Sequence, residues 1–259
     1  MMKFCTRDAL VLILCLFSSI GNSVWASPLE MADSSRFFIE LEGQKVFQAL
    51  NDAAVPGNTG TRFSMMDVTD SSFFGYRIEP VFQISPRHQI RGVFAPLQVD
   101  GTGRLSRPVT FEGASFSEAT EAEGFYQFNS YRLTYRYAFV PGKGTWSVFG
   151  GFTGKIRDAK IRLKQGGLVR EKSNVGFVPL LYGAVAYHMG GGWSAELEVD
   201  ALAAPQGRAE DVRVGLRKSF YPGLSALVGY RLLEGGADND EVYTFSLFHY
   251  AVASLAYGF

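Results

Sequence analysis

Charged side chains recur at every second position in several segments of this 259-residue chain. Glu196, Glu198 and Asp200 follow one another in this way, and arginines repeat at this spacing elsewhere. Because residues two apart share one face of a β-strand, these groups are predicted to line a common surface, where guanidinium groups can form charge-assisted hydrogen bonds with carboxylates. The candidates are Glu40, Glu42, Arg77, Glu79, Arg91, Arg132, Arg136, Lys155, Arg157, Glu196, Glu198, Asp200, Asp211, Arg213, Arg217 and Arg231.

Residue spacing does not assemble a catalytic or metal centre. No nucleophile, base and orienting acid can be grouped around His88, His188 or His249 from their sequence neighbours. The acidic segment 238–241 lacks the spacing of a calcium loop and is interpreted as a turn. We therefore predict no catalytic residues, no metal site and no cofactor.

Ten strands are expected to position the charged face. Apolar and aromatic residues alternate with the charged ones within each strand. Short Gly- or Pro-containing turns alternate with longer connections at 49–71, 102–123, 164–172, 204–208 and 235–240; the segment 102–123 could hide extra pairing. The expected strands are 36–48, 72–85, 88–101, 124–140, 145–163, 173–189, 192–203, 209–220, 223–234 and 241–259.

The N-terminal segment 1–26 has the pattern of a secretory signal peptide. Lys3 and Arg7 precede a short apolar run, and Val24-Trp25-Ala26 is a small-x-small cleavage pattern. Both cysteines lie in this segment, so the mature chain is expected to contain no disulfide. With 25 Lys and Arg against 25 Asp and Glu, the composition lacks the basic excess of nucleic-acid-binding proteins.

The last strand carries a resemblance to a known class of proteins. Glu241 to Phe259 reads EVYTFSLFHYAVASLAYGF, with Tyr257 two residues before the terminal Phe259. This segment resembles the closing strand of bacterial outer-membrane β-barrels. The resemblance implies an all-β fold in which residues 36–259 form a closed antiparallel transmembrane β-barrel, with about ten strands and eight or twelve as alternatives. A soluble β-sandwich is the other alternative.

The resemblance also implies a cellular setting. Turns would be periplasmic, longer connections extracellular, and residues 27–35 a periplasmic leader. Localisation in the outer membrane of a Gram-negative bacterium would follow export. Tyr257 and Phe259 would be the signal read by the barrel-assembly machinery, with periplasmic chaperones as further partners. Outer-membrane lipids and lipopolysaccharide would surround the barrel.

Within such a barrel the charged face would fill a narrow lumen as an ionic network, and a selectivity lining for a small solute is the alternative. Adjacent charges at Arg157 and Asp158 predict a bulge or the membrane edge. Beyond them, an outward basic hairpin could contact anionic lipid, with a solvated extension as the alternative. Its candidate residues are Lys160, Arg162, Lys164, Arg170 and Lys172.

Enzymatic barrels differ from this sequence at the decisive positions. Lipid A deacylases and outer-membrane phospholipases place a serine two residues after the histidine, where Ala251 follows His249. Omptin-type proteases pair an Asp-x-Asp with an Asp-x-His, and no histidine here has Asp two residues before it. We predict a non-enzymatic structural or surface-binding barrel. The alternatives are a small-solute or hydrophobic-ligand channel of porin-like character and a lipid-modifying hydrolase.

Overall fold

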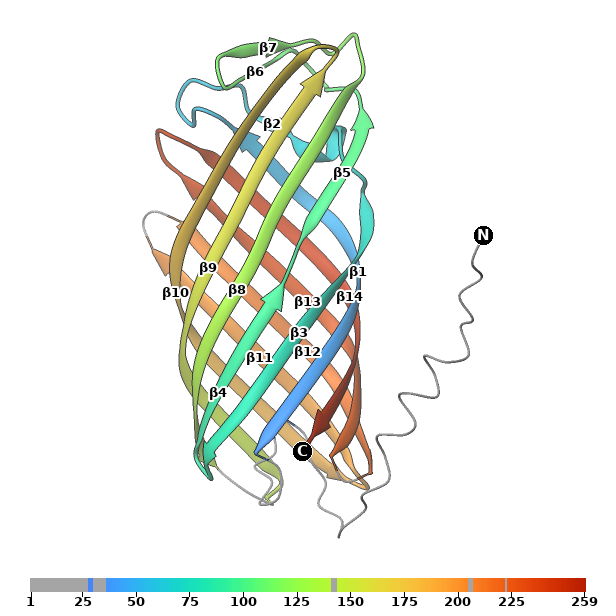
Figure 1. The fold of residues 1–259 in the computed structure, drawn as a ribbon, viewed down its shortest axis with the longest axis vertical. Helices are drawn as coiled ribbons and strands as arrows, with labels where there is room; N and C mark the ends of the chain where they lie inside the picture. The colour runs from blue at the N-terminus through green and yellow to red at the C-terminus, as the bar shows by residue number, and fades with distance from the viewer. Residues whose placement is uncertain (1–27, 30–35, 141–143, 205–206, 222) are drawn as a thin grey trace, which may run out of the picture.

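The structure, a computed structural model, describes residues 28–29, 36–140, 144–204, 207–221 and 223–259. The predicted signal peptide and most of the leader lie outside these residues. The wall is a closed antiparallel barrel of ten strands in chain order, the third of which is interrupted (Figure 1). The strands are β1 (Phe37–Ala54), β3 (Ser72–Ser85), β4 (His88–Ala95) continued by β5 (Gln98–Gly103), β8 (Ala122–Val140), β9 (Trp146–Gln165), β10 (Leu168–Gly190), β11 (Trp193–Ala204), β12 (Gly207–Tyr221), β13 (Leu224–Asp238) and β14 (Tyr243–Gly258).

Pairing of the first and last strands closes the barrel. β1 and β14 are aligned from Phe38 opposite Gly258 to Ala54 opposite Tyr243. Closure provides both strands with hydrogen-bonding neighbours on each side, as a sheet requires where water is absent. The predicted ten-stranded barrel is therefore confirmed, and the β-sandwich is excluded.

The two ends of the barrel differ. The backbone of Phe37 pairs with that of Phe259 at one end, which we call the turn end, where the connections are short. At the opposite loop end, residues 55–71 contain β2 (Phe63–Ser64) and a 3₁₀ turn, Met65–Asp67. Residues 104–121 contain a separate hairpin of β6 (Val109–Phe111) and β7 (Ala114–Phe116), the hidden pairing that the sequence allowed.

Several expected boundaries at the loop end were wrong. β1 continues to Ala54 instead of ending at 48, and β10 begins at Leu168 instead of 173. The connections expected over 164–172, 204–208 and 235–240 are short, because cross-strand pairing continues nearly to their tips. The difference in connection length therefore rests on the two connections that follow β1 and β5.

The expected bulge at 157–158 is absent. Ser130 lies opposite Arg157 and Asn129 opposite Asp158 without a register shift, so these adjacent charges point to opposite faces. Asp158 Oδ2 accepts hydrogen bonds from Gln127 and Asn129 on the outer face. On β8, Gln127 and Asn129 lie on the loop-end side of the half-buried Tyr131 and the exposed Leu133, so this position marks the border of the apolar belt rather than a bulge.

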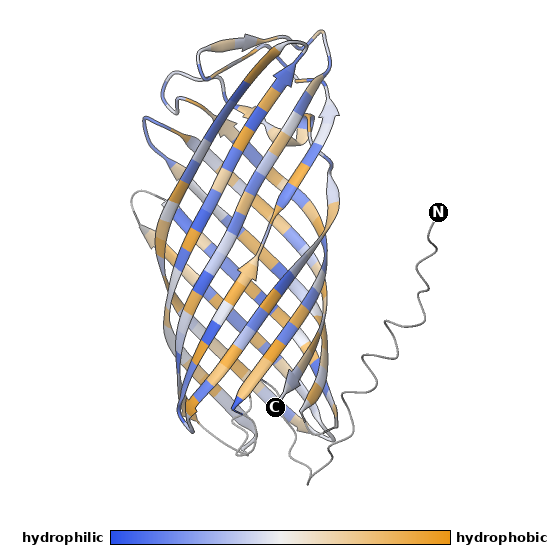
Figure 2. Ribbon diagram, viewed as in Figure 1, coloured by the Kyte–Doolittle hydropathy of each residue, from blue (hydrophilic) through white to orange (hydrophobic). Residues whose placement is uncertain are grey.

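Hydrophilic and hydrophobic residues alternate along the strands (Figure 2). On the outer surface, large apolar side chains are exposed around the barrel, including Leu133, Phe152, Leu181 and Leu255. An exposed apolar belt on a closed barrel is the surface expected of a wall that faces lipid. None of the helices in the described ranges is long and apolar enough to cross a membrane.

Candidate functional site

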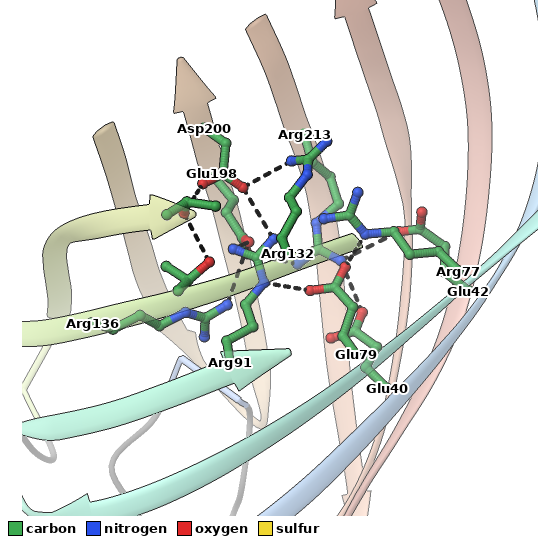
Figure 3. A network of polar contacts seen from close by, with 12 residues as sticks. Glu40, Glu42, Arg77, Glu79, Arg91, Arg132, Arg136, Glu198, Asp200 and Arg213 are labelled. Carbon is green, nitrogen blue, oxygen red and sulfur yellow. Dashed lines mark hydrogen bonds and ion pairs between the residues drawn. The ribbon is translucent and has the colours of Figure 1, made fainter. Parts of the chain in front are cut away.

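The predicted charged face points into the barrel, where it forms a network across the lumen (Figure 3). Period-two alternation turns one side chain of each adjacent pair inward, and closure brings the inward sides of distant strands together. Seven carboxylates and seven arginines in this layer are almost completely buried, together with Lys155. We call these fifteen residues the lumen network. They are Glu40, Glu42, Arg77, Glu79, Arg91, Arg132, Arg136, Lys155, Glu196, Glu198, Asp200, Asp211, Arg213, Arg217 and Arg231.

Arg213 joins three acidic side chains from two strands. Its Nη1 donates to Glu40 Oε1 at 2.9 Å and to Glu42 Oε2 at 3.3 Å. Its Nη2 donates to Glu198 Oε2 at 3.1 Å. Arg217, two inward positions along β12, donates to Glu40 Oε2 at 2.9 Å. One guanidinium layer therefore connects β1 with β11 through β12.

A second group of contacts crosses to the opposite wall. Arg132 Nη1 donates to Asp200 Oδ2 at 3.0 Å, and its Nη2 lies 2.7 Å from Asp211 Oδ2. Arg91 Nη1 lies 2.7 Å from Glu198 Oε1, and its Nε donates to Glu79 Oε2 on the neighbouring β3 at 2.7 Å. Strands β4 and β8 are thereby tied to β11 and β12 across the lumen.

Two of the predicted network residues behave differently. Arg157 faces the lumen but lies away from the carboxylates and donates to Asn174 Oδ1. Lys155 is buried, and its Nζ lies 4.6 Å from the ring centroid of Phe128. Sequence reasoning also missed the hydroxyl groups of this layer. Thr153 donates to Asp200 Oδ1 at 2.5 Å, and Ser254 donates to Glu40 Oε1 at 2.5 Å. The inward positions of Thr153 and Ser254 in the strand alternation could have identified them from the sequence.

The lumen network is a packed layer rather than the lining of a wide pore. An aqueous pore would leave its lining charges accessible to water, whereas Arg91, Lys155 and Arg217 are each at most 2 % exposed. Buried charges remain stable when they are paired and hydrogen-bonded, and most of these arginines contact more than one carboxylate. The expected narrow lumen filled by an ionic network is thus observed.

Apolar layers lie on both sides of the lumen network. At the loop end, Phe111 and Phe116 of the β6–β7 hairpin join a buried cluster with Phe63, whose ring centroid is 5.9 Å from that of Phe111. At the turn end, Leu29 from the leader is 1 % exposed and packs in a cluster with Phe149 and other inward residues. The ionic layer is therefore enclosed between two apolar ones.

The basic hairpin is split between two faces. Lys160, Arg162 and Lys164 occupy alternate outward positions of β9, beyond the apolar belt. Arg170 and Lys172 have the parity of the inward residues of β10, and Lys172 Nζ lies 3.5 Å from Glu112 Oε1 in the loop-end hairpin. The five side chains therefore do not form one patch.

The outward basic residues are partly neutralised. Lys160 Nζ lies 3.4 Å from Glu171 Oε1, and Lys164 Nζ lies 2.8 Å from Glu123 Oε1. Arg162 instead stacks over Phe125, with its guanidinium carbon 5.1 Å from the ring centroid. Away from this hairpin, in the connection that follows β1, Arg62 donates to Asp52, and this hydrogen bond raises the pKa of the Arg62 guanidinium.

The histidines do not converge on one site. His249 points outward from β14 and contacts the Tyr230 hydroxyl. His88 contacts the Tyr135 hydroxyl at 2.6 Å near the turn end, and His188 Nε2 lies 2.9 Å from Ser147 Oγ. Across the described ranges, no group of three or more His, Cys, Asp or Glu side chains is arranged to hold a metal ion.

The C-terminal residues lie at the turn end. The ring of Phe259 is 5.0 Å from that of Phe37 and 5.8 Å from that of Tyr257, measured between centroids. Phe259 remains 63 % exposed. Alternate residues of the last strand from Ala251 to Leu255 are exposed between buried ones, and these exposed residues form its outward face.

No protein-family model matches the chain, and no curated protein matches it. Solved structures similar to it include Ail of Yersinia pestis, at 8 % identity and a TM-score of 0.39, covering 85 % of this chain and 99 % of that one. The translocator domain of the autotransporter NalP from Neisseria meningitidis has 10 % identity, a TM-score of 0.42, and coverages of 98 % and 94 %. The outer membrane protease OmpT of Escherichia coli has 8 % identity, a TM-score of 0.42, and coverages of 90 % and 100 %.

The sequence identities and TM-scores are too low to transfer an activity from these proteins to this chain. Closure of the ten-stranded sheet, the exposed apolar belt and the charged interior come from the structure itself. The chain is a closed ten-stranded antiparallel β-barrel with an apolar outer belt and a charged interior.

Proposed function

We propose that this protein is a non-conducting barrel of the Gram-negative outer membrane that binds anionic lipid or lipopolysaccharide at its loop end. In this orientation the turn end is periplasmic and the loop end is extracellular. Cleavage of the segment 1–26 after export belongs to the same proposal, as do recognition of the last strand by the assembly machinery and the help of periplasmic chaperones.

The observation that carries the proposal is the filled lumen. A buried ionic layer lies between an apolar cluster under the β6–β7 hairpin and another that contains Leu29. A solute would have to displace paired charges as well as two apolar layers. Function is therefore expected on the outer surfaces, and the most extended of these is the sheet formed by β8, β9 and β10 at the loop end (Figure 1).

The outward basic row on this sheet supplies the binding chemistry. Lys160, Arg162 and Lys164 point to the side that continues the lipid-facing wall, beyond the exposed Ile156. This position corresponds to the headgroup level, where lipopolysaccharide carries phosphates that lysine and arginine bind well. The ion pairs with Glu171 and Glu123 reduce the net attraction. The attraction that remains acts between exposed charges, so binding should weaken as salt concentration rises.

Two measurements on the refolded barrel test this function. In planar bilayers, after heat-modifiable migration has confirmed folding, we expect no discrete conductance steps. In detergent, fluorescently labelled lipopolysaccharide should bind about tenfold more weakly to a variant with Lys160, Arg162 and Lys164 replaced by Gln, given about 1 kcal/mol per cation at a membrane surface and partial neutralisation.

The matched control replaces Arg170 and Lys172, which lie on the opposite face, with Gln. Reproducible single-channel openings would contradict the non-conducting barrel. Equal loss of binding in the test and control variants would contradict the assignment to the outward row. A changed lipid profile on expression that disappears in His249→Ala would replace the proposal with the lipid-modifying alternative.

A further inference from the structure

The barrel wall has a break between β3 and the next strand. Pairing of β3 with β4 ends with Ile78 opposite Phe94, and beyond Pro96 the chain continues as β5, which pairs with β8. Within the described ranges, residues 72–77 of β3 therefore have a ladder partner in β1 but none in β4 or β5. Pro96 cannot donate a backbone hydrogen bond, which favours the interruption.

Two cavities meet at this break. An inner cavity faces the lumen network, and an outer groove opens on the lipid-facing side. Both are lined by Phe73, Gly75 and Pro96. Since Phe73 and Gly75 occupy inward positions of β3 and the groove also contains the outward Phe74, the two cavities adjoin through the thickness of the wall.

The outer groove is aromatic and lies near the border of the apolar belt. Phe74, Tyr76, Phe94 and Tyr131 contribute to its lining, and Phe74 is 83 % exposed. The groove leaves about 370 Å³ for the centres of water-sized atoms. Gln98 and Asn129 complete the lining, so the groove has an aromatic side and a polar side. An alkyl chain can lie along the aromatic side of an open groove of this size in a lipid-facing wall, and its remainder would lie in the bilayer.

The inner cavity is small and cationic. It leaves about 30 Å³ for the centres of water-sized atoms. At roughly 10–15 Å³ for each such atom, this space holds about two oxygens. Arg77, Arg132 and Arg231 line it together with the single acid Asp211.

Arg77 presents an unused donor in this cavity. Its Nε donates to Glu79 and its Nη1 donates to Asp211, but its buried Nη2 has no hydrogen-bond acceptor among the described residues. An unsatisfied buried guanidinium N–H is costly and favours an acceptor in the adjoining space.

We propose that the wall break is a lateral binding site for a single-chain amphiphile with a carboxylate head, such as a long-chain fatty acid. The carboxylate occupies the inner cavity and accepts a hydrogen bond from Arg77 Nη2. The alkyl chain passes Phe73 and Pro96 into the aromatic groove. A phosphate head is disfavoured because its additional oxygens exceed the space available. This site is independent of the basic row on β9.

The test uses radiolabelled palmitate and the refolded full barrel in detergent. We expect saturable binding of one palmitate per barrel. Hexadecanol and hexadecyl phosphate, which share the chain but not the head, should bind about ten- to hundredfold more weakly, as expected for a hydrogen bond to a charged group.

Gly75→Val is the blocking variant. A Cβ at Gly75 would lie 3.1 Å from Gln44 Oε1, and the larger side chain would occupy space where the two cavities adjoin. Gly183→Val is its control, since a Cβ there meets nothing within 4 Å. Binding should be lost only in Gly75→Val, with heat-modifiable migration retained in both. Arg77→Met should weaken palmitate binding but not hexadecanol binding.

Three results would overturn the proposal. Undiminished palmitate binding by a folded Gly75→Val barrel would place the ligand elsewhere. Equal binding of hexadecanol would show adsorption of the chain without a carboxylate site, and equal binding of hexadecyl phosphate would contradict the volume argument. Should Gly75→Val fail to fold, the comparison of the three ligands on the unaltered barrel decides the question.

Discussion

Replacing Arg217 with Met tests whether the lumen is dry. Arg217 Nε donates to Glu196 Oε1 at 2.7 Å, and its Nη2 lies 2.9 Å from Glu40 Oε2. The arginine is 1 % exposed. Removing one partner of a buried ion pair costs about 3–5 kcal/mol, because the remaining carboxylates are left desolvated without their counter-charge. In a water-filled lumen the same pair would contribute only about 0–1 kcal/mol.

The losses of stability expected for a dry lumen and for a water-filled lumen differ enough to be distinguished by equilibrium unfolding. The free energy of unfolding is measured by urea titration of the barrel in lipid vesicles, using tryptophan fluorescence and gel migration. The exposed pair of Lys160 with Glu171 provides the control, and Lys160→Met should change the free energy by no more than about 1 kcal/mol. The double variant Arg217→Met with Glu196→Met should recover part of the loss, since it removes one of the unpaired acids.

An Arg217→Met barrel as stable as the unaltered protein would refute the packed network. It would mean that water solvates Glu196 and Glu40 in the lumen. The proposal of a non-conducting barrel would then lose its main support, which is the filled lumen. A search for a solute pathway would start from the lumen network.

Two further predictions concern assembly and the barrel wall. Deletion of Phe259, which removes its ring contacts with Phe37 and Tyr257, should impair insertion into the outer membrane while export continues. Membrane fractionation would show this as accumulation in the periplasm, and normal insertion would contradict a role for the terminal residue. Gly151→Ala should destabilise the barrel by about 1–3 kcal/mol, because its Cβ would be forced against the carbonyl oxygen of Tyr135 on β8. Gly183→Ala, with open space around the new Cβ, should be close to neutral in the same urea titration, and equal effects of the two substitutions would contradict this packing argument.

The sequence by itself determined the alternation and the architecture that follows from it. A period of two assigns each side chain of a strand to one of two faces, so Glu196 and Glu198 could be placed opposite Leu197 without knowledge of any partner. Ten such strands, a predicted signal peptide and a closing strand ending in Phe259 favoured a membrane barrel.

The tertiary structure alone decided which groups meet. Arg213 and Glu40 are 173 residues apart, and their contact depends on barrel closure and on the relative register of distant strands. The alternation within a single strand carries no information about barrel closure or about the register of distant strands. For the same reason, the outward direction of Lys160 and the inward direction of Lys172 became clear only when pairing across the Gln165 and Leu168 turn was known.

The wall break was also beyond sequence reasoning. The expected strand 88–101 ran through Pro96 without a break, and a proline within a strand is also compatible with an edge position or a bulge. Only the three-dimensional arrangement shows that β5 leaves β3 and stays with β8, which brings Arg77 of the lumen network and Phe74 of the outer surface to the two sides of one opening. The reason is that strand pairing is a non-local choice, determined by packing over the whole barrel rather than by the residues at the break.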